Sequence, residues 1–104
     1  MSKIVLKKVK LVGNWPPNSP IDIRFLNKKI GNPPLIVNQT SVWVNYPPNT
    51  NFNLSTPGNL WQYWNNAFFC MCHQPLDIDP TQTNAEAVIM TPFGDTHIKY
   101  DIVP

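Results

Sequence analysis

Apolar and polar residues alternate along most of this chain with a period of two, which is typical of β-strands. The segment IDIRFLN shows the pattern clearly, because Ile21, Ile23 and Phe25 fall on one face of a strand. Asp22 and Arg24 fall on the other face. The alternation and the β-branched and aromatic residues together predict seven or eight short strands, in the segments 3–13, 21–27, 35–39, 41–46, 51–55, 67–73, 86–91 and 96–103.

Turn-forming sequences rich in proline, asparagine and glycine separate these segments, for example NWPPNSP, GNPP, YPPNT and PFGD. One stretch, residues 59–67, predicts a helical turn instead, because Leu60, Tyr63 and Trp64 would share one helical face. Short strands at this spacing predict an all-β chain that forms a single antiparallel β-sandwich over residues 1–104. The apolar strand positions predict a core made of Val5, Val9, Ile23, Phe25, Val42, Val44, Phe52, Leu54, Val88, Met90, Ile98 and Tyr100.

Two segments resemble the cupredoxin-like proteins. In PLIVNQTSVWVNYPPNTNF, a valine-rich strand leads to a Trp-x-Asn formed by Trp43 and Asn45, and a loop follows. TPFGDTHIKYDIV is similar to the terminal strand of that family, in which a Pro-Phe-Gly or Pro-Gly turn precedes a tyrosine. The resemblance implies a cupredoxin-like sandwich, and an immunoglobulin-like sandwich is the alternative with the same architecture.

The copper ligands of the cupredoxin-like proteins are not matched. Asn51 or a neighbour stands where copper-binding members have a histidine after the Trp-x-Asn. Asp101 and Ile102 stand where their cysteine would follow Tyr100. The resemblance therefore implies a fold without implying the mononuclear copper site, and a fold alone does not define a function.

The stretch Cys70-Met71-Cys72-His73 carries the candidate metal chemistry of the chain. Sulfur and imidazole are ligands that copper and zinc prefer, so Cys70, Cys72 and His73 form a candidate site for either metal. Free cysteine also packs as a small buried hydrophobe, and this interpretation is the preferred one. A redox-sensitive thiol is a third possibility.

Charged residues make up 13% of the chain and are unevenly distributed. Seven of the eight basic residues lie in the first 29 positions and five of the six acids lie after residue 76. The basic segment raises the question of nucleic-acid binding. Its lysines interleave with apolar residues in a predicted strand, so we expect a solvated strand face or a protected sheet edge, and no nucleic-acid partner.

Several other classes of function are not indicated. No nucleophile elbow, phosphate-binding loop or paired-carboxylate motif occurs, and Cys72 and His73 would face opposite sides of a strand, so we predict no enzymatic activity and no cofactor. Lysines interrupt the N-terminal segment where a signal peptide would be apolar, and no run is long enough to span a membrane. We therefore expect a cytoplasmic protein without a membrane partner.

The segment 31–76 contains no Asp, Glu, Lys or Arg, although it holds eight aromatic residues among asparagines and prolines. Composition bias explains part of this pattern. Uncharged surfaces rich in aromatic residues are also typical of the centres of protein interfaces. Such surfaces suit carbohydrate binding as well, because aromatic faces stack on sugar rings. We predict an interaction or self-assembling module, with a homo-oligomer or a protein partner formed through Tyr46, Trp61, Tyr63 and Trp64.

Overall fold

The computed structural model describes residues 2–25, 28–47, 50–54, 58–64, 67–70 and 83–103. These residues form nine strands and no helix: β1 (Ser2–Gly13), β2 (Ser19–Phe25), β3 (Lys28–Val37), β4 (Val44–Asn45), β5 (Asn51–Leu54), β6 (Trp61–Trp64), β7 (Ala67–Cys70), β8 (Ala85–Thr91) and β9 (Gly94–Val103). In this part of the chain, no helix is present that has the length and apolarity to cross a membrane.

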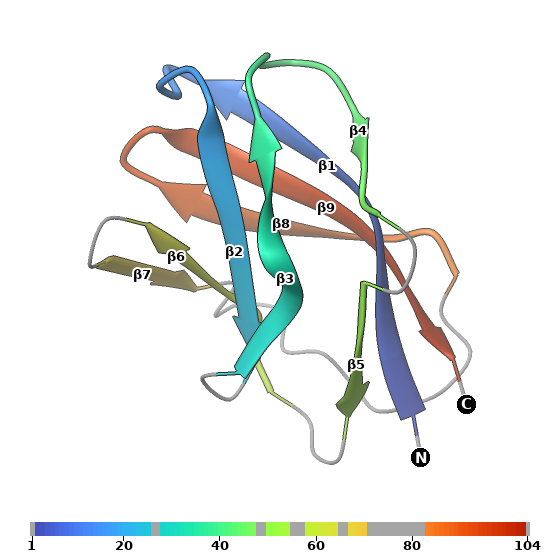
Figure 1. The fold of residues 1–104 in the computed structure, drawn as a ribbon. Coiled ribbons are helices and arrows are strands. Elements are labelled where there is room, and N and C mark those ends of the chain that lie inside the picture. The colour runs from blue at the N-terminus through green and yellow to red at the C-terminus, as the bar shows by residue number, and fades with distance from the viewer. Residues whose placement is uncertain are drawn as a thin grey trace.

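The strands form two antiparallel sheets packed together as a β-sandwich, which confirms the predicted fold class (Figure 1). The five-stranded sheet, sheet A, has the order β4-β1-β9-β8, and β5 also pairs with β1. The four-stranded sheet, sheet B, has the order β3-β2-β6-β7. One hydrophobic core lies between the sheets.

The longest pairing joins β1 to β9, so the first and last strands of the described chain are neighbours in sheet A. A β-bulge interrupts their register between Leu6 and Lys8. Because a bulge adds one residue to one strand, it changes which side chains point inward. Ile4 and Leu6 are buried before the bulge, whereas Val9 and Leu11 are buried after it.

Four predicted core residues are confirmed as buried, namely Val9, Ile23, Ile98 and Tyr100. The prediction is wrong for Val42 and Met90, which are 42% and 73% exposed. Val42 precedes the short strand β4, and Met90 points to the outer face of β8. Val5, Val44 and Val88 are half-buried, and the side chains of Phe25, Phe52 and Leu54 lie outside the described set.

The helical turn predicted within residues 59–67 is wrong. Residues 61–64 form β6, which pairs with β2 on one side and with β7 on the other. Strand β4 is shorter than predicted, and residues 71–73 of the predicted segment 67–73 lie outside the described residues. Cross-strand pairing on both sides of β6 replaces the local helical contacts that the spacing of Leu60, Tyr63 and Trp64 would allow.

The turn between β8 and β9 is held tightly against the end of β1. Gly13 and Gly94 face each other with φ values of 119° and 139°, which only glycine adopts readily. A Cβ atom on either residue would clash with the backbone of the facing segment. The amide of Asn14 donates a hydrogen bond of 2.8 Å to the carbonyl oxygen of Phe93. The close approach fixes Phe93 at one end of the sandwich.

Candidate functional site

Strand β6 divides the predicted interface residues between its two faces. Leu60 and Gln62 are 0% exposed and point into the core, whereas Trp61 and Tyr63 are half-buried on the outer face of sheet B. Trp64 is two residues after Gln62 and therefore points to the same inner face. Trp61 and Trp64 therefore do not share a face, because residues three apart in a strand point to opposite sides.

Trp61 and Tyr63 lie beside an ion pair from β2. Tyr63 is opposite Asp22 in the register, and Trp61 is opposite Arg24. Arg24 donates hydrogen bonds to Asp22 of 2.9 and 3.2 Å, and its guanidinium lies 4.7 Å from the centre of the Tyr63 ring. The hydrogen bonds that Arg24 donates to the Asp22 carboxylate raise the pKa of Arg24. We call Asp22, Arg24, Trp61 and Tyr63 the sheet B patch.

Strand β6 reverses the usual arrangement of a strand in a sandwich, because it buries its polar residue and turns two aromatic residues outward. Neither amide atom of Gln62 has a hydrogen-bond partner among the described residues. In the register, Gln62 lies opposite Ile23 on one side and Phe69 on the other, and both of these residues contribute to the core. The reversal was not visible in the sequence WQYW, because alternation alone does not say which face is inside.

Trp64 belongs to an aromatic cluster at one end of the sandwich. Its ring centre lies 6.3 Å from that of Trp15 and 5.8 Å from that of Phe93, with edge-to-face geometry in both pairs. The rings of Trp15 and Phe93 are 5.3 Å apart. Such aromatic pairs stabilise a protein by more than the burial of their apolar surface alone would contribute. Trp64 therefore packs at one end of the hydrophobic core.

Tyr46, one of the four residues of the predicted interface, is buried with 9% of its surface exposed, so it offers little surface to a partner. Its amide donates a hydrogen bond of 2.9 Å to the carbonyl oxygen of Lys7, which anchors the residue to β1. Its hydroxyl has no partner among the described residues, and burial raises its pKa. Tyr46 therefore packs as a core residue at the edge of sheet A.

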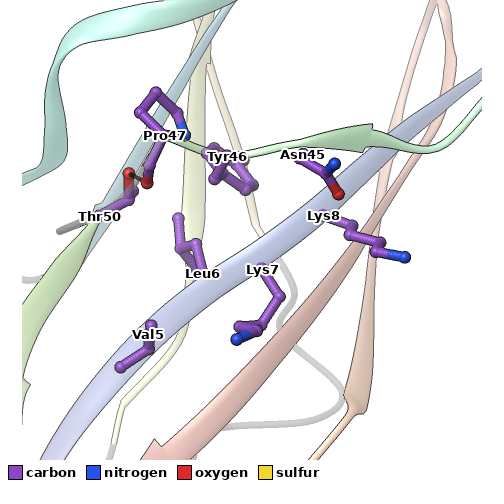
Figure 2. A pocket seen from close by; sticks show the side chains of 8 residues that line it. All are labelled: Val5, Leu6, Lys7, Lys8, Asn45, Tyr46, Pro47 and Thr50. Atoms are coloured by element: carbon purple, nitrogen blue, oxygen red, sulfur yellow. Dashed lines mark hydrogen bonds between the residues drawn. The ribbon is translucent and has the colours of Figure 1, made fainter.

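A hollow of about 370 Å³ lies beside Tyr46, where the edge of sheet A passes from β4 to β5 (Figure 2). Thr50 holds the chain between β4 and β5 against β1. Its backbone carbonyl oxygen accepts a hydrogen bond of 2.9 Å from the amide of Leu6, and its hydroxyl donates one of 2.7 Å to the carbonyl oxygen of Pro47. The hollow is lined by Val5, Leu6, Lys7, Lys8, Asn45, Tyr46, Pro47 and Thr50. Among these lining residues, no nucleophile stands beside a base.

A smaller hollow of about 170 Å³ lies at the end of the sandwich that carries the aromatic cluster. Its lining includes Trp15, Asn38, Gln39 and Thr40 and no charged residue. Such a lining resembles the uncharged surface predicted for sugar binding. Trp15 is only 7% exposed and packs against two other rings, however, so it offers no open ring face on which a sugar would stack.

The candidate metal ligands fall largely outside the described residues. Cys72 and His73 belong to the segment 71–82, and Cys70 is described by its backbone alone, which lies opposite Trp61 at the end of β7. No group of three or more histidine, cysteine or acidic side chains occurs among the described residues. Copper or zinc binding by Cys70, Cys72 and His73 stays a prediction.

Sequence reasoning did not identify a cluster around Trp43 on the outer face of sheet A. The Nζ atoms of Lys10 and Lys99 lie 4.8 and 5.3 Å from the centre of the Trp43 ring. The His97 ring packs edge-on at 6.5 Å, and its Nδ1 lies 3.1 Å from a carboxylate oxygen of Glu86. We call these five residues the Trp43 cluster. These residues come from four separate segments of the chain, so no local sequence motif predicts the cluster.

Comparison of the chain with protein-family models, with curated proteins and with solved structures gave no match.

Proposed function

We propose that this protein is a non-enzymatic self-association module that pairs with a second copy of itself through the sheet B patch. The observation that carries the proposal is the reversed pattern of β6, in which Gln62 is buried while Trp61 and Tyr63 face outward. An internal glutamine without a partner costs about 1–3 kcal/mol of stability. A leucine at position 62 and polar residues at positions 61 and 63 would suit the fold better. Proteins usually depart from such a stabilising pattern at functional surfaces.

The chemistry of the patch suits a protein contact. Tryptophan, tyrosine and arginine are the residue types most enriched among interface residues that dominate binding energy, and the patch contains one of each. Arg24 over the ring of Tyr63 also presents a flat surface that is rigid enough to pack against a partner.

A second copy is the partner that the charges favour. Asp22 and Arg24 stand two residues apart on the same face and together carry no net charge. In a two-fold symmetric contact the same patch meets itself, so Asp22 of one copy approaches Arg24 of the other without bringing like charges together. The resemblance to cupredoxin-like proteins implies a fold for this module, and it does not imply a metal site.

Sedimentation velocity over a range of protein concentrations tests the proposal. We expect the parent protein to form dimers that increase with concentration, and we expect Trp61→Ser to weaken dimerisation by about 2 kcal/mol or more, which is roughly thirtyfold. Gln62→Leu is the matched control, because it changes the neighbouring residue on the opposite face. It should unfold at a higher denaturant concentration and dimerise as the parent does.

Two outcomes would overturn the proposal. One is a parent protein that stays monomeric at the highest concentration it tolerates in solution. The other is a Trp61→Ser variant that keeps a cooperative unfolding transition and dimerises like the parent. If the monomeric parent instead bound neutral oligosaccharides, with quenching of tryptophan fluorescence that Trp61→Ser abolished, carbohydrate binding by the same patch would replace self-association.

A further inference from the structure

The outer face of sheet A concentrates lysines that lack acidic partners. Lys8 lies directly opposite Lys99 in the register of β1 and β9, and Lys10 lies opposite His97 in the row two residues along. Like charges directly opposite each other destabilise a sheet. Among the described residues, none of these three lysines forms an ion pair. The fold therefore holds three ammonium groups in neighbouring rows without neutralising them.

The carboxylate opposite Lys99 does not pair with it. Glu86 lies opposite Lys99 on the other side of β9, but its carboxylate is 3.1 Å from His97 instead. Lys10 and Lys99 are directed to the ring of Trp43, at 4.8 and 5.3 Å. A ring attracts cations without cancelling their charge, so the surface around Trp43 stays positive.

The surface also offers apolar contact. Trp43 is half-buried, so part of its indole remains accessible. Val42, beside it in the chain, is 42% exposed, and Met90 on the outer face of β8 is 73% exposed. An accessible aromatic ring next to unpaired lysines on an open sheet face is the combination that stacks bases and contacts the backbone in single-stranded nucleic-acid binding.

We propose that this face of sheet A binds single-stranded nucleic acid. Lys10 and Lys99 move from the Trp43 ring to phosphates, Lys8 contacts a further phosphate, and a base stacks on the ring in their place. A single strand fits better than a duplex, because stacking on Trp43 requires a base that is not already stacked and paired. The site lies on the opposite layer from the sheet B patch and does not depend on self-association. This proposal revises the expectation that the lysines of β1 form only a solvated strand face. The sequence did not show that Trp43 and Lys99 lie beside these lysines.

Fluorescence anisotropy with a labelled oligothymidylate of about ten nucleotides tests the proposal, because one small domain covers a site of this size. Three phosphate contacts predict that log K falls with log salt concentration with a slope of about −2. Lys10→Gln and Lys99→Gln should each reduce the steepness of the slope by about 0.7. Trp43→Leu should weaken binding about tenfold or more with little change in slope, and Trp43→Phe should restore part of the affinity.

Lys3→Gln is the matched control, because Lys3 is an exposed lysine of the same strand at the far end of the sheet. It should leave the slope close to that of the parent. Three results would overturn the proposal: no binding at low salt, an effect of Lys3→Gln equal to that of Lys10→Gln, or full affinity in a folded Trp43→Leu variant. Equal competition by inorganic polyphosphate would also overturn it, since that ligand has no base. Trp61→Ser should bind the oligonucleotide as the parent does, so failure here is distinct from failure of self-association.

Discussion

Tyr46 shows how one backbone contact decides the role of a side chain. The sequence YPPNT predicts a surface loop, and loops are generally exposed. The structure instead ties Tyr46 to β1 through the hydrogen bond from its amide to Lys7, and the ring packs into the edge of the core. Because that bond joins residues 39 positions apart in the chain, the local sequence could not reveal it.

Replacing Tyr46 with phenylalanine should stabilise the protein. The buried hydroxyl has no partner among the described residues, so removing it should raise the free energy of unfolding by about 1–3 kcal/mol. Urea denaturation of the parent and of Tyr46→Phe at neutral pH measures the difference. A less stable variant would mean that the hydroxyl donates a hydrogen bond in solution.

The same substitution should change the response to alkaline pH. Burial raises the pKa of Tyr46 in the folded state above its value near 10 in the unfolded chain. The folded state therefore disfavours the phenolate. Stability is unaffected below about pH 10, where the phenol is neutral in both states, and is lost as the pH rises toward the folded-state pKa, at up to ~1.4 kcal/mol per pH unit. Above about pH 10 the parent should lose stability more steeply than Tyr46→Phe, and the lysines cancel in the comparison.

At the scale of elements, β6 leads to a direct comparison of two tryptophans in one strand. Trp64 packs against Trp15 and Phe93, whereas Trp61 lies on the outer face. Trp64→Ala should therefore lower the free energy of unfolding by about 3 kcal/mol, near the lower limit for a large aromatic residue because Trp64 is only half-buried. Trp61→Ala should cost about 1 kcal/mol or less, by urea denaturation of dilute monomer. Equal losses would contradict the assignment of faces.

The elements that the sequence predicted best are those with a long, regular alternation. β9 alternates over its whole length, and β2 buries Ile21 and Ile23 on the expected face. β1 was located correctly, but Val5 was expected in the core, whereas Ile4 and Leu6 are the buried residues. The apolar residues change phase at Lys7 and Lys8, which is the signal of the bulge. β6 was missed because four residues are too few to separate a helical from an extended period.

At the scale of the whole molecule, the uneven charge of the chain has a structural counterpart. The basic first strand and the acid-containing last strand pair side by side in sheet A (Figure 1). Lys7 and Asp101 come within 3.9 Å, although an exposed ion pair of this length contributes little to stability. The sandwich was predictable from alternation and turns. The pairing of β1 with β9, and the Trp43 cluster that it creates, depends on contacts between distant segments that no local pattern encodes.

The whole fold should be independent of metal. Among the described residues, the core between the sheets contains sixteen buried hydrophobic residues, from Ile4 in β1 to Ile102 in β9. Structural zinc contributes about 10 kcal/mol to small domains that cannot fold without it. A core of this extent has no such need, so thermal unfolding with and without a chelator should give the same Tm.

Replacing Cys70 and Cys72 together by serine separates packing from metal binding. If both thiols are buried in apolar surroundings, each hydroxyl should cost roughly 1–3 kcal/mol, and the parent should contain no stoichiometric metal by elemental analysis. The double variant is then less stable than the parent, and adding a chelator changes neither protein. Suppose instead that chelator lowers the Tm of the parent to that of the double variant, and that the parent carries one equivalent of copper or zinc. Cys70, Cys72 and His73 would then form a metal site that supports the fold, and the burial of the two thiols as simple hydrophobes would be wrong.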